Sequence, residues 1–178
     1  MSAGPFRVAL TGTPGTGKTA VARELVRGGW AVLDVAEYAT TEGFVVEEDV
    51  ERGSLVLDEE AIAEALAAET TWPDGPIVLD GHVAHLLPVE ATVVLRCDPI
   101  VLYERLRGRG WSEPKVRENV EAEALSVIAE EAEGERVAEI DTTRREPLDV
   151  AREVHALATK GFPPRKRIGW DASALPWL

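Results

Sequence analysis

The residues best suited to chemistry lie in one short stretch near the N-terminus. Residues 12–19 read GTPGTGKT, which fits the spacing G-x-x-x-x-G-K-[ST], between a strand-like run and a helix-like run. Glycines let backbone N–H groups turn toward phosphate oxygens, and the N-terminus of the following helix adds its positive end. The sequence therefore predicts a loop that holds the phosphates of a nucleotide, rather than a glycine turn without a ligand.

The polar positions of this loop have expected roles. Lys18 is expected to bridge the β- and γ-phosphates, and the hydroxyl of Thr19 is expected to ligate Mg²⁺. Further nucleotide contacts are expected from the rest of the motif, namely Gly12, Gly15, Thr16 and Gly17. No N-K-x-D motif is present, so a guanine nucleotide is not expected.

A second group of polar residues follows the apolar run PIVLD at residues 76–80. Asp80 ends this run, where an acidic residue commonly provides the second anchor of a Mg-nucleotide. We predict that Asp80 joins the magnesium shell and that His82 positions a reacting group, whereas His85 is interpreted as structural. Asp80 as a turn former and the two histidines as ligands of a transition metal are the alternatives, although no further metal ligand stands nearby.

Three arginines alternate along the end of a helix-like run. Arg105 and Arg109 share a face at helical spacing, while Arg107 turns away. Phosphoryl transfer requires cations around the equatorial oxygens, so Arg105 and Arg109 are predicted to contact phosphate. The other interpretation is a solvated basic helix end that complements the helix dipole. A glycine-containing joint that carries an arginine over the nucleotide would act as a lid.

Strand-like and helix-like runs alternate along the chain, which is the pattern of an α/β domain with a buried parallel sheet. The predicted strands are Phe6–Leu10, Ala31–Asp34, Pro76–Asp80, Ala91–Leu95 and Arg136–Ile140. The predicted helices are Lys18–Val26, Glu59–Glu69, Ile100–Arg107, Lys115–Glu133 and Pro147–Thr159. We therefore expect one domain over residues 1–160, and a tail over residues 161–178 whose role the sequence leaves open.

Composition narrows the classes of partner. The net charge is −13, with 32 acidic and 19 basic residues, which disfavours tight direct binding of nucleic acid. This acidity fits either a salt-rich environment or a basic partner, and composition does not separate the two. Because no run is long and apolar enough to cross a bilayer, and Cys97 is the only cysteine, the sequence predicts a cytoplasmic protein without a membrane partner.

From Arg7 to about Lys160 the sequence resembles the atypical adenylate kinases known as adenylate kinase isoenzyme 6, which include archaeal members. The resemblance is carried by GTPGTGKT, VLDGH, VVLRCDPIVLYERLRGRGW and KVRENVEAE. It implies a P-loop NTPase of the adenylate kinase type, with a five-stranded parallel sheet flanked by helices. It also implies a nucleoside-monophosphate-binding insertion at residues 35–56 and a short lid at residues 108–118.

The resemblance further implies an activity and partners. Family members transfer phosphate from ATP to AMP, hydrolyse ATP, and act in late maturation of the small ribosomal subunit and its rRNA while bound to a basic ribosomal protein of the platform. By matching motif, Ala20 joins the ATP-binding backbone, Asp80 and His82 form the D-x-H pair, and Arg109 is the catalytic arginine of the lid. Contact with the pre-ribosomal small subunit would then be indirect.

Two departures from the family pattern affect these expectations. The insertion contains Arg52 as its single basic residue among six carboxylates, and this composition repels a dianionic acceptor such as AMP. Trp111 stands where the family usually has tyrosine. A small-metabolite kinase and an ATP-gated assembly chaperone with little kinase activity therefore stay open as alternatives, although a metabolite kinase requires basic or hydroxyl-binding residues that this insertion scarcely offers.

Overall fold

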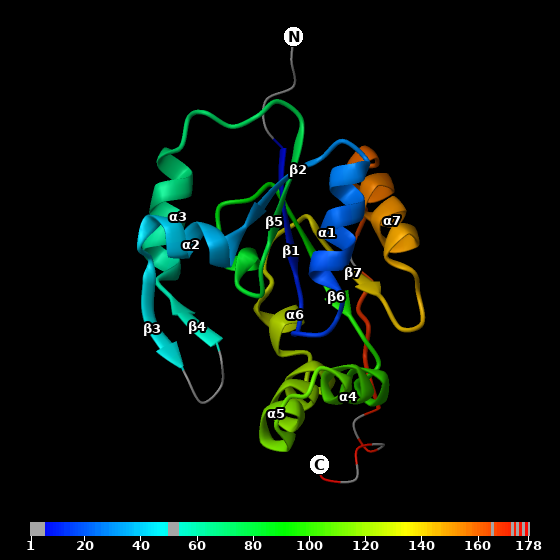
Figure 1. Cartoon of the computed structure of the whole chain (residues 1–178). Coiled ribbons are helices and arrows are strands. Elements are labelled where there is room, and N and C mark those ends of the chain that lie inside the picture. Colours follow the sequence, from blue (N-terminus) through cyan, green and yellow to red (C-terminus); the bar gives the residue numbers. More distant parts are fainter. Residues whose placement is uncertain are drawn as a thin grey trace.

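Five parallel strands form the central sheet of the computed structural model, in the order β2-β5-β1-β6-β7 (Figure 1). The strands are β1 Phe6–Thr11, β2 Ala31–Asp34, β5 Pro76–Asp80, β6 Ala91–Arg96 and β7 Val137–Asp141. The structure describes residues 6–49, 54–164, 166–171, 173, 175 and 177. The predicted five-stranded parallel sheet is confirmed, and each strand lies within one residue of its expected bounds.

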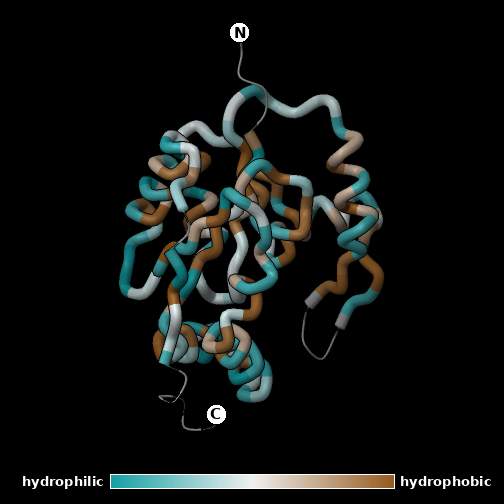
Figure 2. Tube along the Cα trace, turned by 180° about the vertical axis from the view of Figure 1, so that it is seen from behind, coloured by the Kyte–Doolittle hydropathy of each residue, from teal (hydrophilic) through white to brown (hydrophobic). Residues whose placement is uncertain are grey.

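Helices cover both faces of this sheet, and alternate residues of each strand reach opposite faces. Val8 and Leu10 pack into a core with α1 (Lys18–Arg27) and α7 (Pro147–Thr159). Ala9 belongs to the core on the other face, which includes side chains of α2 (Val35–Glu42) and α3 (Glu59–Ala68). Figure 2 shows hydrophobic residues along the central strands, as expected where both faces of a parallel sheet are covered.

The predicted insertion contains a helix and a hairpin that the sequence did not indicate. After α2 the chain forms β3 (Val45–Asp49) and β4 (Ser54–Leu57), which pair antiparallel as a separate two-stranded sheet. Asp34 caps α2 by accepting from the backbone N–H groups of Ala36 and Glu37, both at 3.0 Å. Arg52, the single basic residue of the insertion, lies outside the described residues.

The predicted single helix Lys115–Glu133 is wrong. The chain forms α4 (Pro99–Gly108), α5 (Glu113–Ala124) and α6 (Val127–Glu131), and between the last two Ser126 adopts a left-handed conformation with φ 60°. Arg96 Nη2 donates to the carbonyl of Glu123 at 3.1 Å and to Ser126 Oγ at 2.9 Å. A buried arginine from β6 thus donates hydrogen bonds to groups at the end of α5, where the helix leaves backbone carbonyls without partners. No local sequence pattern indicates this contact between distant residues.

The chain after α7 returns to the sheet and then to α4 and α5. Leu175 is buried in a cluster with Leu102, Leu106 and Val120, and the ring centre of Trp177 lies 5.2 Å from that of Tyr103. A short 3-10 turn, Ala84–Leu86, follows β5. Within the described part of the chain, no helix has the length and apolar character needed to span a bilayer.

Candidate nucleotide site

The loop between β1 and α1 has a backbone that requires its glycines. Gly12, Gly15 and Gly17 have φ values of 135°, 95° and 104°, in the region that favours glycine. A Cβ at Gly12 would lie 2.3 Å from the carbonyl oxygen of Leu95, and one at Gly15 would lie 2.7 Å from Leu106 Cδ2. Two of the glycines therefore allow close packing of the loop against β6 and α4, which a larger residue would prevent.

Lys18 holds its ammonium group inside this loop. Nζ donates to the carbonyl oxygens of Gly12 at 2.6 Å and Thr13 at 3.3 Å. Burial lowers the pKa of Lys18 to about 8; the negative charge of Asp80 partly opposes this, and the positive charge of Arg109 adds to it. The loop thus concentrates positive charge where backbone N–H groups and a helix N-terminus also favour an anion.

Asp80 and Thr19 provide oxygen donors beside the loop. Asp80 is 6% exposed, and burial raises the pKa of its carboxyl group, while a hydrogen bond from Thr19 and the charge of Lys18 lower it. Asp34 pairs in register with Asp80 across β2 and β5 and adds a second carboxylate. Mg²⁺ prefers oxygen ligands and usually takes one or two carboxylates together with substrate phosphates, so these residues fit the ion.

These groups meet at one cavity of about 320 Å³ at the carboxyl ends of β1, β2 and β5. Its lining contains most of the residues predicted from sequence, namely Gly15, Gly17, Lys18, Thr19, Ala20, Asp80, His82 and Arg109. Gly12 is buried under the loop, and Thr16 and Arg105 line a neighbouring cavity of about 290 Å³ that shares Gly15, Gly17 and Arg109. The structure therefore brings the predicted residues together around a single loop.

The two histidines after β5 have different surroundings. His82 is an exposed residue of the cavity, and its backbone carbonyl accepts from Thr11 Oγ1 at 2.9 Å. Desolvation and the positive charges of Lys18 and His85 lower the pKa of His82, which favours a neutral imidazole. The side chain of His85 is 2% exposed and lies between Thr11 Oγ1, at 3.0 Å from Nδ1, and Glu131 Oε2, at 3.3 Å from Nε2. His85 thus joins β1 to α6.

The three arginines at the C-terminal end of α4 separate as their spacing predicts. Arg109 lines both cavities, whereas the guanidinium of Arg107 lies over the ring of Tyr103, 5.7 Å from its centre. Arg105 donates from Nη2 to the carbonyl of Thr142 at 3.0 Å. One of its donor groups thus binds the chain that follows β7. The joint between α4 and α5 is shorter than residues 108–115, since only Arg109–Ser112 lie outside the helices.

Several residues of the site were missed in the sequence. Asp34, Ala36 and Trp111 line the nucleotide cavity, and Thr142 and Arg145 line the neighbouring one. The signal for Asp34 was its place at the end of a predicted strand, but the strand order was needed to put it next to Asp80. Trp111 was noted only for its departure from the family pattern, and no periodicity marks a residue in a short turn.

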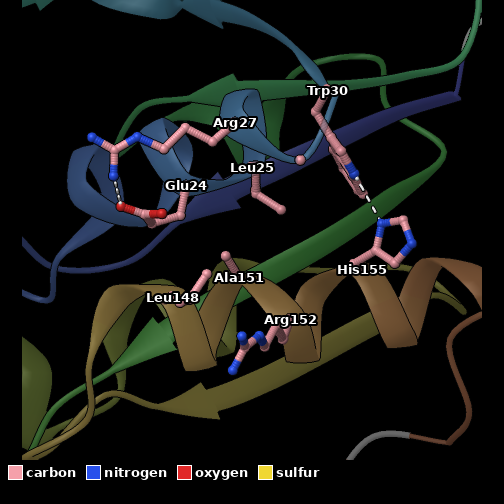
Figure 3. A pocket seen from close by; sticks show the side chains of 9 residues that line it. Glu24, Leu25, Arg27, Trp30, Leu148, Ala151, Arg152 and His155 are labelled. Carbon is pink, nitrogen blue, oxygen red and sulfur yellow. Dashed lines mark hydrogen bonds and ion pairs between the residues drawn. The ribbon is translucent and has the colours of Figure 1, made fainter.

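A further cavity of about 340 Å³ lies between α1 and α7 (Figure 3). Its lining includes Leu25, Leu148 and Ala151, and Trp30 Nε1 donates to His155 Nδ1 at 3.2 Å across one end. Figure 3 shows this hydrogen bond, with Glu24 and Arg27 paired on the α1 side. None of the residues predicted for the nucleotide site lines this cavity.

Known proteins resemble this chain in sequence over most of its length. The chain matches the model of the AAA domain family over residues 8–126. It is 42% identical over 173 residues to the "Putative adenylate kinase" of Archaeoglobus fulgidus, covering 96% of this chain and 91% of that protein. A relative with the same description in Natronomonas pharaonis is 44% identical over 156 residues, with coverages of 85% and 89%.

Solved structures share the fold at lower identity. A gluconokinase from Sinorhizobium meliloti aligns with a TM-score of 0.58 at 19% identity, covering 89% of this chain and 94% of that one. A shikimate kinase from Acinetobacter baumannii aligns with a TM-score of 0.60 at 17% identity, covering 87% and 93%. These two likenesses concern the fold alone. By its sequence matches, the chain belongs to the AAA domain family of P-loop proteins and, within it, to the archaeal adenylate kinase family that its relatives represent.

Proposed function

We propose that this protein transfers the γ-phosphoryl group of ATP to a nucleoside monophosphate, with AMP as the expected acceptor and water as a slow substitute. The observation that carries the proposal is the meeting of Lys18, Asp80, His82 and Arg109 at one cavity beside the phosphate loop. An acceptor phosphate oxygen forms a bond to the γ-phosphorus, the bond to the β–γ bridging oxygen breaks, and two diphosphates result. With water as acceptor the products are ADP and phosphate.

Each residue has a role in this proposal. The loop from Gly12 to Ala20 binds the phosphates of ATP through backbone N–H groups, and Lys18 neutralises charge on the β- and γ-phosphates. Thr19 and Asp80 would hold Mg²⁺, which would neutralise charge on the phosphate oxygens. Arg109 stabilises charge that develops on the transferred group, and His82 orients the attacking oxygen. Arg105 helps to shape the neighbouring cavity that also contains Thr16.

A larger cavity supports binding of the acceptor. It measures about 450 Å³, shares Pro14, Ala36, His82 and Trp111 with the nucleotide cavity, and is otherwise lined partly by Leu55 and Leu57 of β4. Its apolar lining fits a nucleoside, and it borders the nucleotide cavity, which Lys18 and Arg109 line and where an acceptor phosphate would meet the donor. We assign residues 35–56 to acceptor binding and residues 108–118 to the lid, with residues 161–178 as a C-terminal tail.

The test is product formation from defined nucleotides. The wild-type protein is incubated with Mg-ATP and, in parallel, AMP, CMP, GMP, UMP or no acceptor, and diphosphates are quantified by anion-exchange chromatography. We expect ADP from AMP well above the hydrolysis background, and loss of both activities in Lys18→Ala. Lys160→Ala is the matched control because Lys160 is an exposed residue at the end of α7. Hydrolysis without transfer to any monophosphate would overturn the kinase assignment.

A second role, in maturation of the small ribosomal subunit, is favoured by the acidic surface of the insertion. Glu37, Glu42, Glu47 and Glu48 are exposed on α2 and β3. Such a surface attracts a cationic protein rapidly and in a salt-dependent way, and it repels RNA. A basic platform ribosomal protein in the cytoplasm fits this description.

The test is capture of that protein at two salt concentrations. We expect capture at about 0.05 M salt and its loss at about 0.5 M. Capture that is equally strong at both concentrations, or unchanged in Glu47→Lys/Glu48→Lys, would contradict electrostatic binding.

A further inference from the structure

A buried charge cluster lies behind the phosphate loop. Arg96, the last residue of β6, donates from Nε to Glu123 Oε1 at 2.8 Å and from Nη1 to Glu139 Oε2 at 2.6 Å. The side chains of Arg96, Glu123 and Glu139 are 1%, 3% and 0% exposed. Because charges without water need a nearly complete set of hydrogen bonds, the arrangement of this cluster depends on every group that contacts it.

The cluster reaches the phosphate loop through Glu123. Thr13 Oγ1 donates to Glu123 Oε2 at 2.7 Å, and Thr13 is 2% exposed. The carbonyl oxygen of Thr13 in turn accepts from Thr16 Oγ1 at 2.8 Å and from Lys18 Nζ at 3.3 Å. Glu123 therefore fixes the side chain of Thr13. The backbone carbonyl of Thr13 in turn accepts the hydrogen bonds that stabilise the turn of the loop and orient Lys18.

The cluster is completed from the other side by residues 166–170, which we call the C-terminal strap. Trp170 Nε1 donates to Glu123 Oε1 at 3.0 Å, and the backbone N–H of Ile168 donates to Glu139 Oε2 at 3.1 Å. Arg96 Nη1 donates to the carbonyl of Ile168 at 3.0 Å. Figure 1 shows the chain after α7, in red, running from the sheet toward α4. The strap thus contacts all three charged side chains.

We propose that Glu123 is a positioning residue for the phosphate loop, and that the C-terminal strap holds Glu123 in its working orientation. Oε1 accepts from Arg96 Nε, from the backbone N–H of Cys97 at 3.1 Å and from Trp170 Nε1, which leaves Oε2 directed at Thr13. Loss of the Trp170 donor frees the carboxylate to shift away from Thr13. Because coupling between two sites is reciprocal, nucleotide binding also stabilises the docked strap.

This inference rests on the proposed function, since it acts through nucleotide binding. The first experiment compares Trp170→Phe with Trp177→Phe, using calorimetric titration with a Mg-bound, non-hydrolysable ATP analogue. Trp177 is the matched control because its indole Nε1 is buried without a hydrogen-bond partner among the described residues. We expect Trp170→Phe to weaken binding by about three- to ten-fold, the range of one lost hydrogen bond, and Trp177→Phe to change it by less than about two-fold.

A double-mutant cycle separates positioning from general stability. Thr13→Val removes the hydroxyl that contacts Glu123, whereas Thr13→Ser keeps a hydroxyl there and is expected to recover most of the affinity that Thr13→Val loses. If Trp170 acts through Glu123 on Thr13, then adding Trp170→Phe to Thr13→Val has little further effect. Additive losses would contradict the proposal, as would wild-type affinity in Trp170→Phe. If wild-type protein itself does not bind the analogue, the proposed function fails instead.

The reciprocal effect is measured by limited proteolysis of the wild-type chain. Trypsin cleavage after Lys166 and Arg167, within the strap, is compared with cleavage after Lys160 at the end of α7. Saturating analogue is expected to slow cleavage within the strap at least about three-fold more than cleavage after Lys160, and this difference is expected to vanish in Thr13→Val. Equal protection of both sites, or a difference that persists in Thr13→Val, would overturn the coupling.

Discussion

Asp34 and Asp80 end neighbouring parallel strands in register, and both residues line the cavity beside the phosphate loop. Asp34 also caps α2, so one residue serves both the insertion and the site. The negative charge of Asp34 contributes to the raised pKa of Asp80, after the larger effect of burial. Two carboxylates at this edge favour a divalent cation, because a cation relieves their mutual repulsion.

Asparagine substitutions distinguish the roles of the two carboxylates. Asp80→Asn is expected to lower Mg²⁺-dependent turnover by about 100-fold, because it removes the proposed ligand. Asp34→Asn keeps the helix cap, since asparagine caps as well as aspartate does, and removes only a nearby charge. We expect a few-fold rise in the Mg²⁺ concentration at half-maximal rate for Asp34→Asn. Both effects are measured by following turnover as the magnesium concentration is varied. A larger loss of turnover in Asp34→Asn than in Asp80→Asn would make Asp34, rather than Asp80, the metal ligand.

Arg109 and Arg107 form a natural pair for comparison. Arg109→Ala is expected to lower the turnover number by about 100-fold, because it removes a cation from the transferred phosphate. Arg107→Ala serves as the control, since Arg107 lies over Tyr103 instead of lining the nucleotide cavity. Steady-state rates at saturating ATP distinguish them. Equal losses in the two variants would show that general positive charge on α4, rather than Arg109 itself, supports turnover.

His82→Ala is expected to slow ATP hydrolysis about ten-fold while the nucleotide still binds, because the proposed role is to orient the attacking oxygen. His155→Ala is the matched control, since His155 contacts Trp30 in the cavity between α1 and α7, which shares no lining residue with the nucleotide cavity. Hydrolysis is followed by phosphate release, and binding by calorimetry. Unchanged hydrolysis in His82→Ala would make His82 a structural residue.

Alanine substitutions at Gly12 and Gly108 test how closely the phosphate loop packs against β6, with Gly108 as the control outside the loop. Gly12→Ala is expected to destabilise the protein by about 2–4 kcal/mol, because its Cβ would overlap the carbonyl oxygen of Leu95 at 2.3 Å and its φ of 135° is strained for alanine. Gly108→Ala, at the end of α4, is expected to be neutral or slightly stabilising, because a Cβ there meets no atom within 4 Å beyond its chain neighbours and its own helix backbone. Urea unfolding measures both, and equal stabilities would contradict this packing.

Acid is expected to destabilise the protein partly through His85. Burial lowers the pKa of His85 below its usual 6.5, although the carboxylate of Glu131 opposes this shift. The unfolded state therefore binds more protons as the pH falls below about 6.5, and stability decreases in that window. Glu131→Gln removes the opposing charge and should steepen the decrease, whereas His85→Gln should flatten it. Thermal melting between pH 7 and pH 5 checks both, and an unchanged slope in both variants would contradict the prediction.

The sheet and the phosphate loop were predictable because their signals are local. The apolar run PIVLD and the motif GTPGTGKT each specify an element or a turn without reference to the rest of the chain. Asp80 then followed from its place at a strand end. The residues predicted for the site lie around the loop because parallel strands place their carboxyl ends along one edge of the sheet.

The features that the sequence did not predict depend mostly on contacts between residues that are distant in sequence. The break between α5 and α6 follows from Arg96, which precedes Glu123 by 27 residues in sequence and reaches the end of α5 only after the sheet has formed. The hairpin β3–β4 was hidden by its many carboxylates, which lower the apparent strand propensity of exposed positions. The tail could not be placed because its contacts follow no repeating pattern: single hydrogen bonds join it to buried charges, and Leu175 and Trp177 pack against α4 and α5.

The insertion begins and ends at capping aspartates, Asp34 before α2 and Asp58 before α3. The described strands of the hairpin between them form their own small sheet and do not pair with the central one. Under the proposed function, the segment that would select the acceptor is therefore built apart from the strand–helix turn that would hold the donor, and changes in the hairpin are expected to alter acceptor preference more than donor binding.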